Sequence, residues 1–358
     1  MPETSSPHRR SGSNAKNELI SIQLLRALAS ILVLMAHLQV KEIQYGDASS
    51  LLWQHFNVGA IGVDIFFVLS GFIIFFVAGN VPSTTAAATR FFKLRVIRVL
   101  PMYWLLTTAA LIVFYMHPEI VNKTASKPTV VLESYFLLPT DNKLLIQNGW
   151  TLSYEMLFYF SFCALIFLPA RFRAPALVTA ACLTVGLGVF ITPQTVTLKF
   201  LSSNLLLEFA YGVVLGAIFI SPERPRYFTP FLGATLLILG AASIALMISI
   251  NLGFGAARGY RYGIPAALLV FAALALERQS RALSSLKILG DSSYSLYLLH
   301  GLSLAAVGMV WKKFHLHGAA SNLAMLLTMA AVSIVSAIAL HLWVEKPLLG
   351  YMRRGLRL

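Results

Sequence analysis

Apolar residues fall along the chain in long runs that are separated by short polar segments. A helix needs about 20 mainly apolar residues to cross the hydrocarbon core of a bilayer, and most of these runs reach about 17 to 25. The pattern predicts an all-α fold, a polytopic membrane bundle of about ten transmembrane helices. The predicted spans are residues 19–40, 58–79, 99–116, 152–170, 174–191, 203–220, 231–250, 260–276, 293–311 and 322–344.

The composition places the chain in the same class, because 58% of its 358 residues are hydrophobic and only 12% are charged. The net charge of +14 is spread over short loops without a basic patch that interleaves aromatic residues, which excludes nucleic acid as a partner. Lys and Arg, including Arg173, are about twice as frequent in the loops on the side of the membrane that holds the N-terminus as in the loops on the other side. This bias predicts that both termini are cytoplasmic. The longest loop, residues 117–149, is predicted on the other side with a short element near 134–138.

The polarity of the chain divides it into three regions. Residues 1–17 are polar and rich in Ser, which predicts a disordered cytoplasmic tail. Residues 18–347 hold the spans and form the membrane domain, and residues 348–358 are a basic cytoplasmic C-terminal tail. Pro347 is expected to end the last helix, and Glu345 to pair with an arginine on the same side.

The first predicted span carries two ionisable side chains, Arg26 and His37. A charge in hydrocarbon is costly and is kept where it faces a protein interior or a wet cavity, which favours a functional role. Eleven steps of about 100° return within roughly 20° of the start, so both side chains lie on one helix face. Asp64 lies at a comparable depth in the second span, where a carboxylate beside the His37 imidazole can orient a general base. The alternatives are a structural hydrogen bond for His37 and a helix cap or lysine pair for Asp64.

Two further polar patterns occur, one just before the third predicted span and one in the ninth. Arg95 and Arg98 lie three residues apart at the entry to the third span, and paired guanidinium groups suit a polyanionic ligand because each forks onto phosphate oxygens. The alternative is an ordinary basic cluster of the cytoplasmic side. In the ninth span Ser293, Tyr297 and His300 form a stripe at i, i+4 and i+7, which either lines a channel or joins helices.

Six motifs follow one another along the chain. They are Arg26-x10-His37, GVDIFFVLSGF at residues 62–72, Arg95-x-x-Arg98, NGWTLSYE at 148–155, DSSYSLYLLH at 291–300 and VEKP at 344–347. Together they resemble the bacterial acyltransferase family 3, and the second motif is similar to the branch that acetylates exopolysaccharides. The resemblance implies an integral enzyme of the bacterial cytoplasmic membrane that uses acyl-CoA to O-acylate a cell-surface or exported glycan.

The resemblance also implies roles for the polar residues that could bind the donor. Arg26, Arg95 and Arg98 would hold the phosphates of acyl-CoA, with acetyl-CoA favoured, and Tyr297 and His300 would line its channel. Neither a permanently bound cofactor nor a metal is implied. The expected partners are membrane lipid, acyl-CoA and a glycan or lipid-linked oligosaccharide acceptor.

The favoured mechanism is direct transfer, in which His37, oriented by Asp64 or Glu155, removes a proton from a sugar hydroxyl that then attacks the thioester carbonyl. An acyl-enzyme on His37, Ser70 or Ser153 is the alternative route. Ser70 is the less favoured nucleophile, because Ser-Gly inside a membrane helix commonly permits close helix packing.

The fourth span opens with side chains that suit a glycan through stacking and hydrogen bonds. Asn148, Trp150 and Ser153 are expected to bind the acceptor, joined by Glu208 from the sixth span. The alternative is a membrane-interface tryptophan beside a helix cap.

A different class of protein also accounts for charges inside spans. In a secondary transporter or flippase for a glycan or another small substrate, Arg26, His37 and Asp64 would serve proton coupling or substrate binding. The chain shows no internal repeat and no paired interruptions in two halves. The ordered motifs therefore favour the enzyme.

Overall fold

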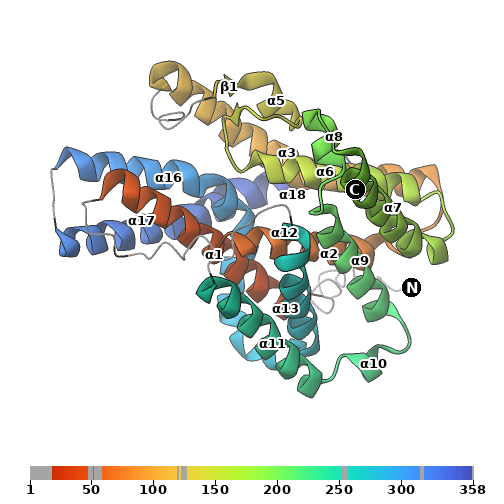
Figure 1. Ribbon diagram of the computed structural model, residues 1–358. Helices are drawn as coiled ribbons and strands as arrows, with labels where there is room; N and C mark the ends of the chain where they lie inside the picture. Colours follow the sequence, from red (N-terminus) through yellow and green to blue (C-terminus); the bar gives the residue numbers. More distant parts are fainter. Residues whose placement is uncertain are drawn as a thin grey trace, which may run out of the picture.

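The computed structural model describes residues 18–46, 51, 59–118, 121, 127–250, 257–314 and 318–356. The predicted tail, residues 1–17, lies outside the described residues. Within the described part, the chain is helical apart from two short strands, so the predicted all-α class is confirmed. Figure 1 shows the helices gathered into one bundle, with α16 and α17 side by side and α1 against them.

The long helices are α1 (Ile20–Tyr45), α2 (Ile61–Ala78), α3 (Thr85–Met116), α6 (Gly149–Leu165), α7 (Ala170–Ile191), α9 (Leu206–Ile220), α11 (Pro230–Ser249), α13 (Gly263–Ala275), α16 (Ser293–Lys313) and α17 (Ala319–Leu340). The short helices are α5 (Val131–Phe136), α8 (Val196–Leu201), α10 (Arg224–Tyr227), α12 (Arg258–Arg261), α14 (Glu277–Ser280), the 3₁₀ helix η3 (Arg281–Leu286), α15 (Lys287–Asp291), the π-helical turn η4 (His341–Glu345) and α18 (Lys346–Gly355). The strands β1 (Thr129–Val130) and β2 (Lys143–Leu144) pair in parallel.

Among the described residues, eight helices are long and apolar enough to cross a membrane. A ninth span forms if Arg258–Ala275 and Glu277–Asp291, which meet at 72°, count as one. The ten predicted spans are therefore one or two too many by length. Helix α6 has 17 residues, because the apolar run after Leu165 forms a turn, and α13 has only 13.

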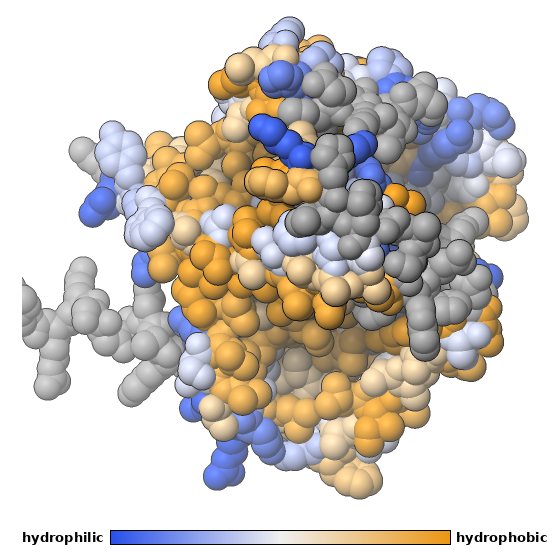
Figure 2. Space-filling model, turned by 90° about the vertical axis from the view of Figure 1, so that its left-hand side faces the viewer, coloured by the Kyte–Doolittle hydropathy of each residue, from blue (hydrophilic) through white to orange (hydrophobic). Residues whose placement is uncertain are grey.

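The helices differ in how much of their apolar surface the protein itself covers. In α2, 72% of the most apolar stretch is buried, against 11% in α11 and 17% in α7. Helix α2 is therefore central, whereas α11 and α7 present apolar side chains outward, as lipid-facing helices do. Figure 2 shows apolar side chains spread over much of one face, with hydrophilic side chains nearer its edges.

Helices α2 and α9 touch through their backbones. A β-carbon on Gly71 would lie 2.1 Å from the carbonyl oxygen of Phe209, and one on Gly212 would lie 2.0 Å from that of Val68. Small residues let membrane helices approach closely in this way. The prediction that Ser70-Gly71 permits close helix packing is confirmed for Gly71.

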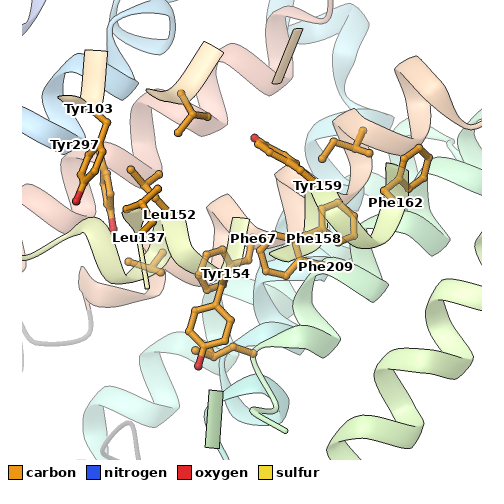
Figure 3. Packing of buried hydrophobic residues seen from close by; sticks show 14 of the residues in the cluster. Phe67, Tyr103, Leu137, Leu152, Tyr154, Phe158, Tyr159, Phe162, Phe209 and Tyr297 are labelled. Carbon is orange, nitrogen blue, oxygen red and sulfur yellow. The ribbon is translucent and has the colours of Figure 1, made fainter. Parts of the chain in front are cut away.

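Stacked aromatic rings fill the centre of the bundle. Phe209 of α9 stacks with both Phe67 of α2 and Phe158 of α6, and the ring centroids of each pair are 4.7 Å apart. Figure 3 shows these rings together, with Tyr154 and Tyr159 of α6 beside them. The cluster fixes α6 against α2, and α6 carries much of the candidate site.

The N-terminus of α1 is capped by a residue far away in the sequence. Leu19, which precedes the helix, offers no side-chain cap. Instead, the carboxylate of Glu277 accepts hydrogen bonds from the backbone N–H groups of Ile20 and Ser21, at 3.2 and 2.9 Å. A carboxylate at this position satisfies unpaired N–H groups and complements the helix dipole, and it holds α1 in place near Arg26.

The segment between α3 and α6 carries β1, α5 and β2, and α5 agrees with the short element predicted near 134–138. Side chains of α3 anchor it. Tyr103 donates a hydrogen bond to the Ser134 carbonyl at 2.6 Å, and the Trp104 indole donates to that of Tyr135 at 2.9 Å. This segment therefore packs against α3 next to the start of α6.

The sequence interpretation was wrong about Arg173, which it counted among the charges of the loops. The side chain is fully buried in the first turn of α7. It donates six hydrogen bonds where α2 and α6 end, at places where helix carbonyls have no partner in their own helix. The acceptors are the carbonyl oxygens of Ala78, Gly79, Val81, Ile166 and Leu168 and the Oγ of Ser83.

The last helix does not end at Pro347, contrary to the prediction. Helix α17 passes through the π-helical turn η4 into α18, which continues to Gly355. Pro347 lies in the first turn of α18, directly after the π-helical turn η4. Most of the region expected as a C-terminal tail is thus helical.

Candidate active site

Polar side chains from five helices line a cavity of about 200 Å³ inside the bundle. Helices α1, α2, α3, α6 and α16 contribute to its walls, which also include Val63, Phe66 and Phe67. Several residues predicted from sequence as site residues therefore share one space. The polar lining includes Arg26, Ser70, Arg95, Arg98, Glu155 and Tyr297.

The three arginines of the cavity differ in their partners. Arg26 donates a hydrogen bond to the Gln23 side chain at 3.0 Å. Arg98 donates to Glu345 at 2.5 Å, which confirms the expected pairing of Glu345 with an arginine. Among the described residues, the buried Nε of Arg95 has no hydrogen-bond partner. Arg95 is consequently the arginine with the most unused capacity for an anionic ligand.

The carboxylate that binds Arg98 is itself well supported. Glu345 is only 1% exposed, and it also accepts hydrogen bonds from Ser295 at 2.7 Å and from His341 at 2.9 Å. This network joins η4 to α3 and α16. Arg98 is therefore part of a structural ion pair as well as part of the cavity wall.

Glu155 lies in the cavity and differs from the expectation that it orients His37. Its Oε1 accepts hydrogen bonds from Ser70 of α2, at 3.1 Å, and from the hydroxyl of Tyr159. Ser70 is thereby placed beside a carboxylate, within the space lined by the arginines.

His37 is oriented by its own helix and by a second histidine. Its Nδ1 lies 2.9 Å from the Val33 carbonyl oxygen, and its ring meets that of His300 edge-on with centroids 4.7 Å apart. A carbonyl can only accept a hydrogen bond, so the neutral ring carries its proton on Nδ1 and leaves the Nε2 lone pair as a base. His300 repeats this arrangement with the Leu296 carbonyl at 2.9 Å.

Asn148 connects the start of α6 to the histidine pair. Its amide nitrogen lies 3.3 Å from Nε2 of His300 and donates to the Tyr297 carbonyl at 2.8 Å. The Tyr297 hydroxyl shares a hydrogen bond with Thr151 at 2.8 Å, and its ring centroid is 6.1 Å from that of His300. Tyr297 therefore stands between the arginine-lined cavity and the histidines.

Asp64 pairs with Arg258 and not with His37, the predicted partner. Arg258 binds both of its carboxylate oxygens, at 2.9 and 2.8 Å, and the carboxylate is fully buried. His37 is held by the Val33 carbonyl, so the structure does not bear out orientation of His37 by Asp64. Sequence reasoning missed Arg258, which lies two residues before the predicted span 260–276, although a carboxylate in a span needs a buried cation.

The residues expected to bind the glycan separate into three groups. Trp150 and Ser153 line a second cavity, which lies beside α6. Asn148 is engaged with His300 and Tyr297, as described above. Glu208 is fully buried near Asp64 and Arg258. Of these four residues, the structure thus brings only Trp150 and Ser153 together, in the wall of the second cavity.

Comparison with known proteins defines the class. The acyltransferase domain of acyltransferase family 3 matches residues 19–342, and the chain belongs to this family of multi-pass membrane proteins. The resemblance stated from the motifs is confirmed.

The chain is also similar to the exopolysaccharide production protein ExoZ of Rhizobium meliloti (strain 1021). The two are 30% identical over 312 residues, which cover 84% of this chain and 92% of ExoZ. No solved structure matches this chain significantly.

Proposed function

We propose that this protein is an O-acyltransferase of the bacterial inner membrane. It moves an acyl group, acetyl above all, from cytoplasmic acyl-CoA to a hydroxyl of an exported glycan such as an exopolysaccharide. Membership of the acyltransferase family supports the reaction class. The similarity to ExoZ, an exopolysaccharide production protein, supports the acceptor class.

The observation that carries the proposal is the convergence of Arg26, Arg95 and Arg98 on one cavity within the membrane domain. A cluster of cations in hydrocarbon needs compensating anions, and the three guanidinium groups outnumber the nearby carboxylates of Glu155 and Glu345, the latter paired with Arg98. The phosphates of coenzyme A supply such an anion at the cytoplasmic end. The mostly apolar remainder of the wall suits the pantetheine arm and the acyl group.

His37 serves as the general base. It lies about 16 Å beyond Arg26 along α1, at 1.5 Å per residue, which is roughly the reach of an extended pantetheine arm. The Nε2 lone pair accepts the proton of the sugar hydroxyl while the hydroxyl oxygen attacks the thioester carbonyl. The tetrahedral intermediate then expels the CoA thiolate, which takes the proton from the imidazolium, and the new ester remains on the sugar.

Tyr297 lies on the route between the two parts of the site. The acyl end of the donor must pass this ring to approach His37, since Tyr297 lines the cavity and packs near His300. The enzyme would hold the phosphates of acyl-CoA near Arg26 and transfer the acyl group near His37. It could then acylate a sugar on the far side of the membrane without moving coenzyme A across.

A specific contact supports a second route for the same reaction. Ser70 donates its hydroxyl proton toward Glu155 inside the cavity, so Glu155 can take that proton while the Ser70 oxygen attacks the thioester. The CoA thiolate leaves and takes the proton from Glu155. The sugar hydroxyl then attacks the acyl-serine and gives its proton to Glu155, the Ser70 oxygen leaves and takes that proton back, and the ester remains on the sugar. Direct transfer predicts that Ser70→Ala keeps glycan acylation, whereas the acyl-enzyme route predicts its loss.

The test is transfer of label from radiolabelled acetyl-CoA to endogenous glycan in inside-out membrane vesicles. Wild type is compared with His37→Ala and with Val40→Ala, an exposed residue on the same helix, at matched expression. We expect label in glycan with wild type and Val40→Ala and none with His37→Ala. Movement of glycan without consumption of acyl-CoA would instead identify a transporter.

A further inference from the structure

A second cavity, of about 350 Å³, lies between the 138–147 segment, the first turn of α6 and α8. Its volume falls in the range of about 300–1,000 Å³ that ligand pockets occupy. Its lining combines aromatic and polar side chains with a single cation, Lys199, where the first cavity has three arginines. Six residues give it this character: Asp141, Asn142, Gln147, Trp150, Tyr154 and Phe200.

The two cavities lie on nearly opposite faces of α6. Trp150, Ser153 and Tyr154 line the second cavity, whereas the arginine-lined cavity is bordered by Thr151, Leu152, Glu155 and Tyr159. At about 100° per residue the mean directions of the two sets differ by about 160°. Helix α6 thus forms the wall between them.

The aromatic side chains of the second cavity form a continuous group. The rings of Tyr154 and Phe200 have centroids 4.2 Å apart, and the ring of Trp150 stands at 90° to that of Tyr154 with centroids 6.1 Å apart. Flat apolar faces of this kind pack against the C–H faces of a pyranose ring. A sugar is apolar on these faces and polar at its edge.

The polar side chains supply the second half of sugar recognition. Asp141 accepts hydrogen bonds, and the amides of Asn142 and Gln147 both donate and accept, which matches hydroxyl groups of either role. All three are exposed, so the cavity opens to water and not to lipid. An acyl chain or lipid tail would leave these groups without partners.

We infer that this second cavity binds a pyranose residue of the acceptor glycan, an assignment that rests on the proposed function. The start of α6 connects it to the base, because Asn148 contacts His300 and His300 packs against His37. The donor and the acceptor therefore approach from opposite faces of α6. Their reacting groups meet at the N-terminal turn of that helix.

The test is binding of oligosaccharides prepared from the deacetylated exopolysaccharide of the host, measured by calorimetry on the full-length protein in lipid nanodiscs without acyl-CoA. We expect saturable binding that Phe200→Ala and Asn142→Ala each weaken by about tenfold, the loss of about 1.4 kcal/mol of contact. The matched controls are Leu198→Ala on α8 and Gln194→Ala, which lie outside the cavity lining and should leave the affinity unchanged. Asn142 is exposed, so its variant should fold even if Phe200→Ala does not.

Label transfer from acetyl-CoA is measured on the same preparations, which separates this assignment from the proposed function. Transfer to glycan by wild type, with no saturable binding or with equal affinity in all variants, would overturn the acceptor cavity alone. Saturable binding that depends on Asn142, without any transfer, would support the cavity as a glycan site and overturn the acyltransferase.

Discussion

Replacement of Arg173 with Met should destabilise the bundle strongly, although sequence places this residue in a loop. The side chain is fully buried and donates six hydrogen bonds to oxygens where α2 and α6 end. Each bond from a charged donor contributes about 1.5–3 kcal/mol, and each buried carbonyl left unpaired costs about 1–3 kcal/mol. The sum of these terms overstates the loss of stability, because the protein relaxes and water enters the site. We therefore expect a loss of about 3–5 kcal/mol, as for removal of one partner from a buried ion pair.

Thermal unfolding in lipid nanodiscs, followed by tryptophan fluorescence, measures this effect. At about 2–4 °C per kcal/mol, Arg173→Met should lower Tm by at least about 6 °C. Arg173→Lys should fall between wild type and Arg173→Met, because a single ammonium cannot reach the acceptors that a guanidinium fork does.

Arg171→Met is the matched control, since Arg171 lies two residues away on the same helix, is exposed and contacts only the ring of Phe172 among the interactions described. Its Tm should stay within about 1 °C of wild type, as for an ordinary surface substitution. If Arg173→Met matched Arg171→Met in Tm, the reasoning about the helix ends would be refuted.

The remaining predictions concern the site. Arg95→Ala should raise the KM for acyl-CoA by about tenfold with kcat nearly unchanged, because the donor loses a phosphate contact of about 1.4 kcal/mol. Steady-state kinetics measures both constants. Arg98→Ala should raise that KM and also lower Tm, because a buried carboxylate loses its cation. His37→Ala should abolish transfer and leave the Kd for acyl-CoA unchanged in equilibrium dialysis. Asp64→Leu and Arg258→Met should each destabilise by about 3–5 kcal/mol, and the double variant should recover much of that loss in thermal unfolding.

Each of these predictions has a control or an opposing outcome. Lys93→Ala, exposed on the same helix as Arg95, should leave the KM for acyl-CoA unchanged, and equal effects at both positions would argue against the donor cavity. Near-normal transfer by His37→Ala would remove His37 as the base. Additive losses from Asp64→Leu and Arg258→Met would show that the two side chains do not act as a pair.

The sequence by itself determined the class of the protein and many of its chemically important residues. Long apolar runs define membrane helices because each span must satisfy its own backbone within about 20 residues. Ionisable residues inside those runs are informative for the same reason, and Arg26 and Glu155 do line one cavity. These signals are local, so a single chain is enough to find them.

Only the tertiary structure decided which polar groups are partners. Asp64 binds Arg258 across 194 positions of sequence, and the Val33 carbonyl, not a carboxylate, orients His37. Arg173 has the charge of a loop residue and the environment of a core residue. Hydropathy gives the depth of a side chain in the membrane but not the direction in which its helix face points. That direction depends on which helices pack together, and here it is fixed by contacts such as the backbone approach of α2 and α9.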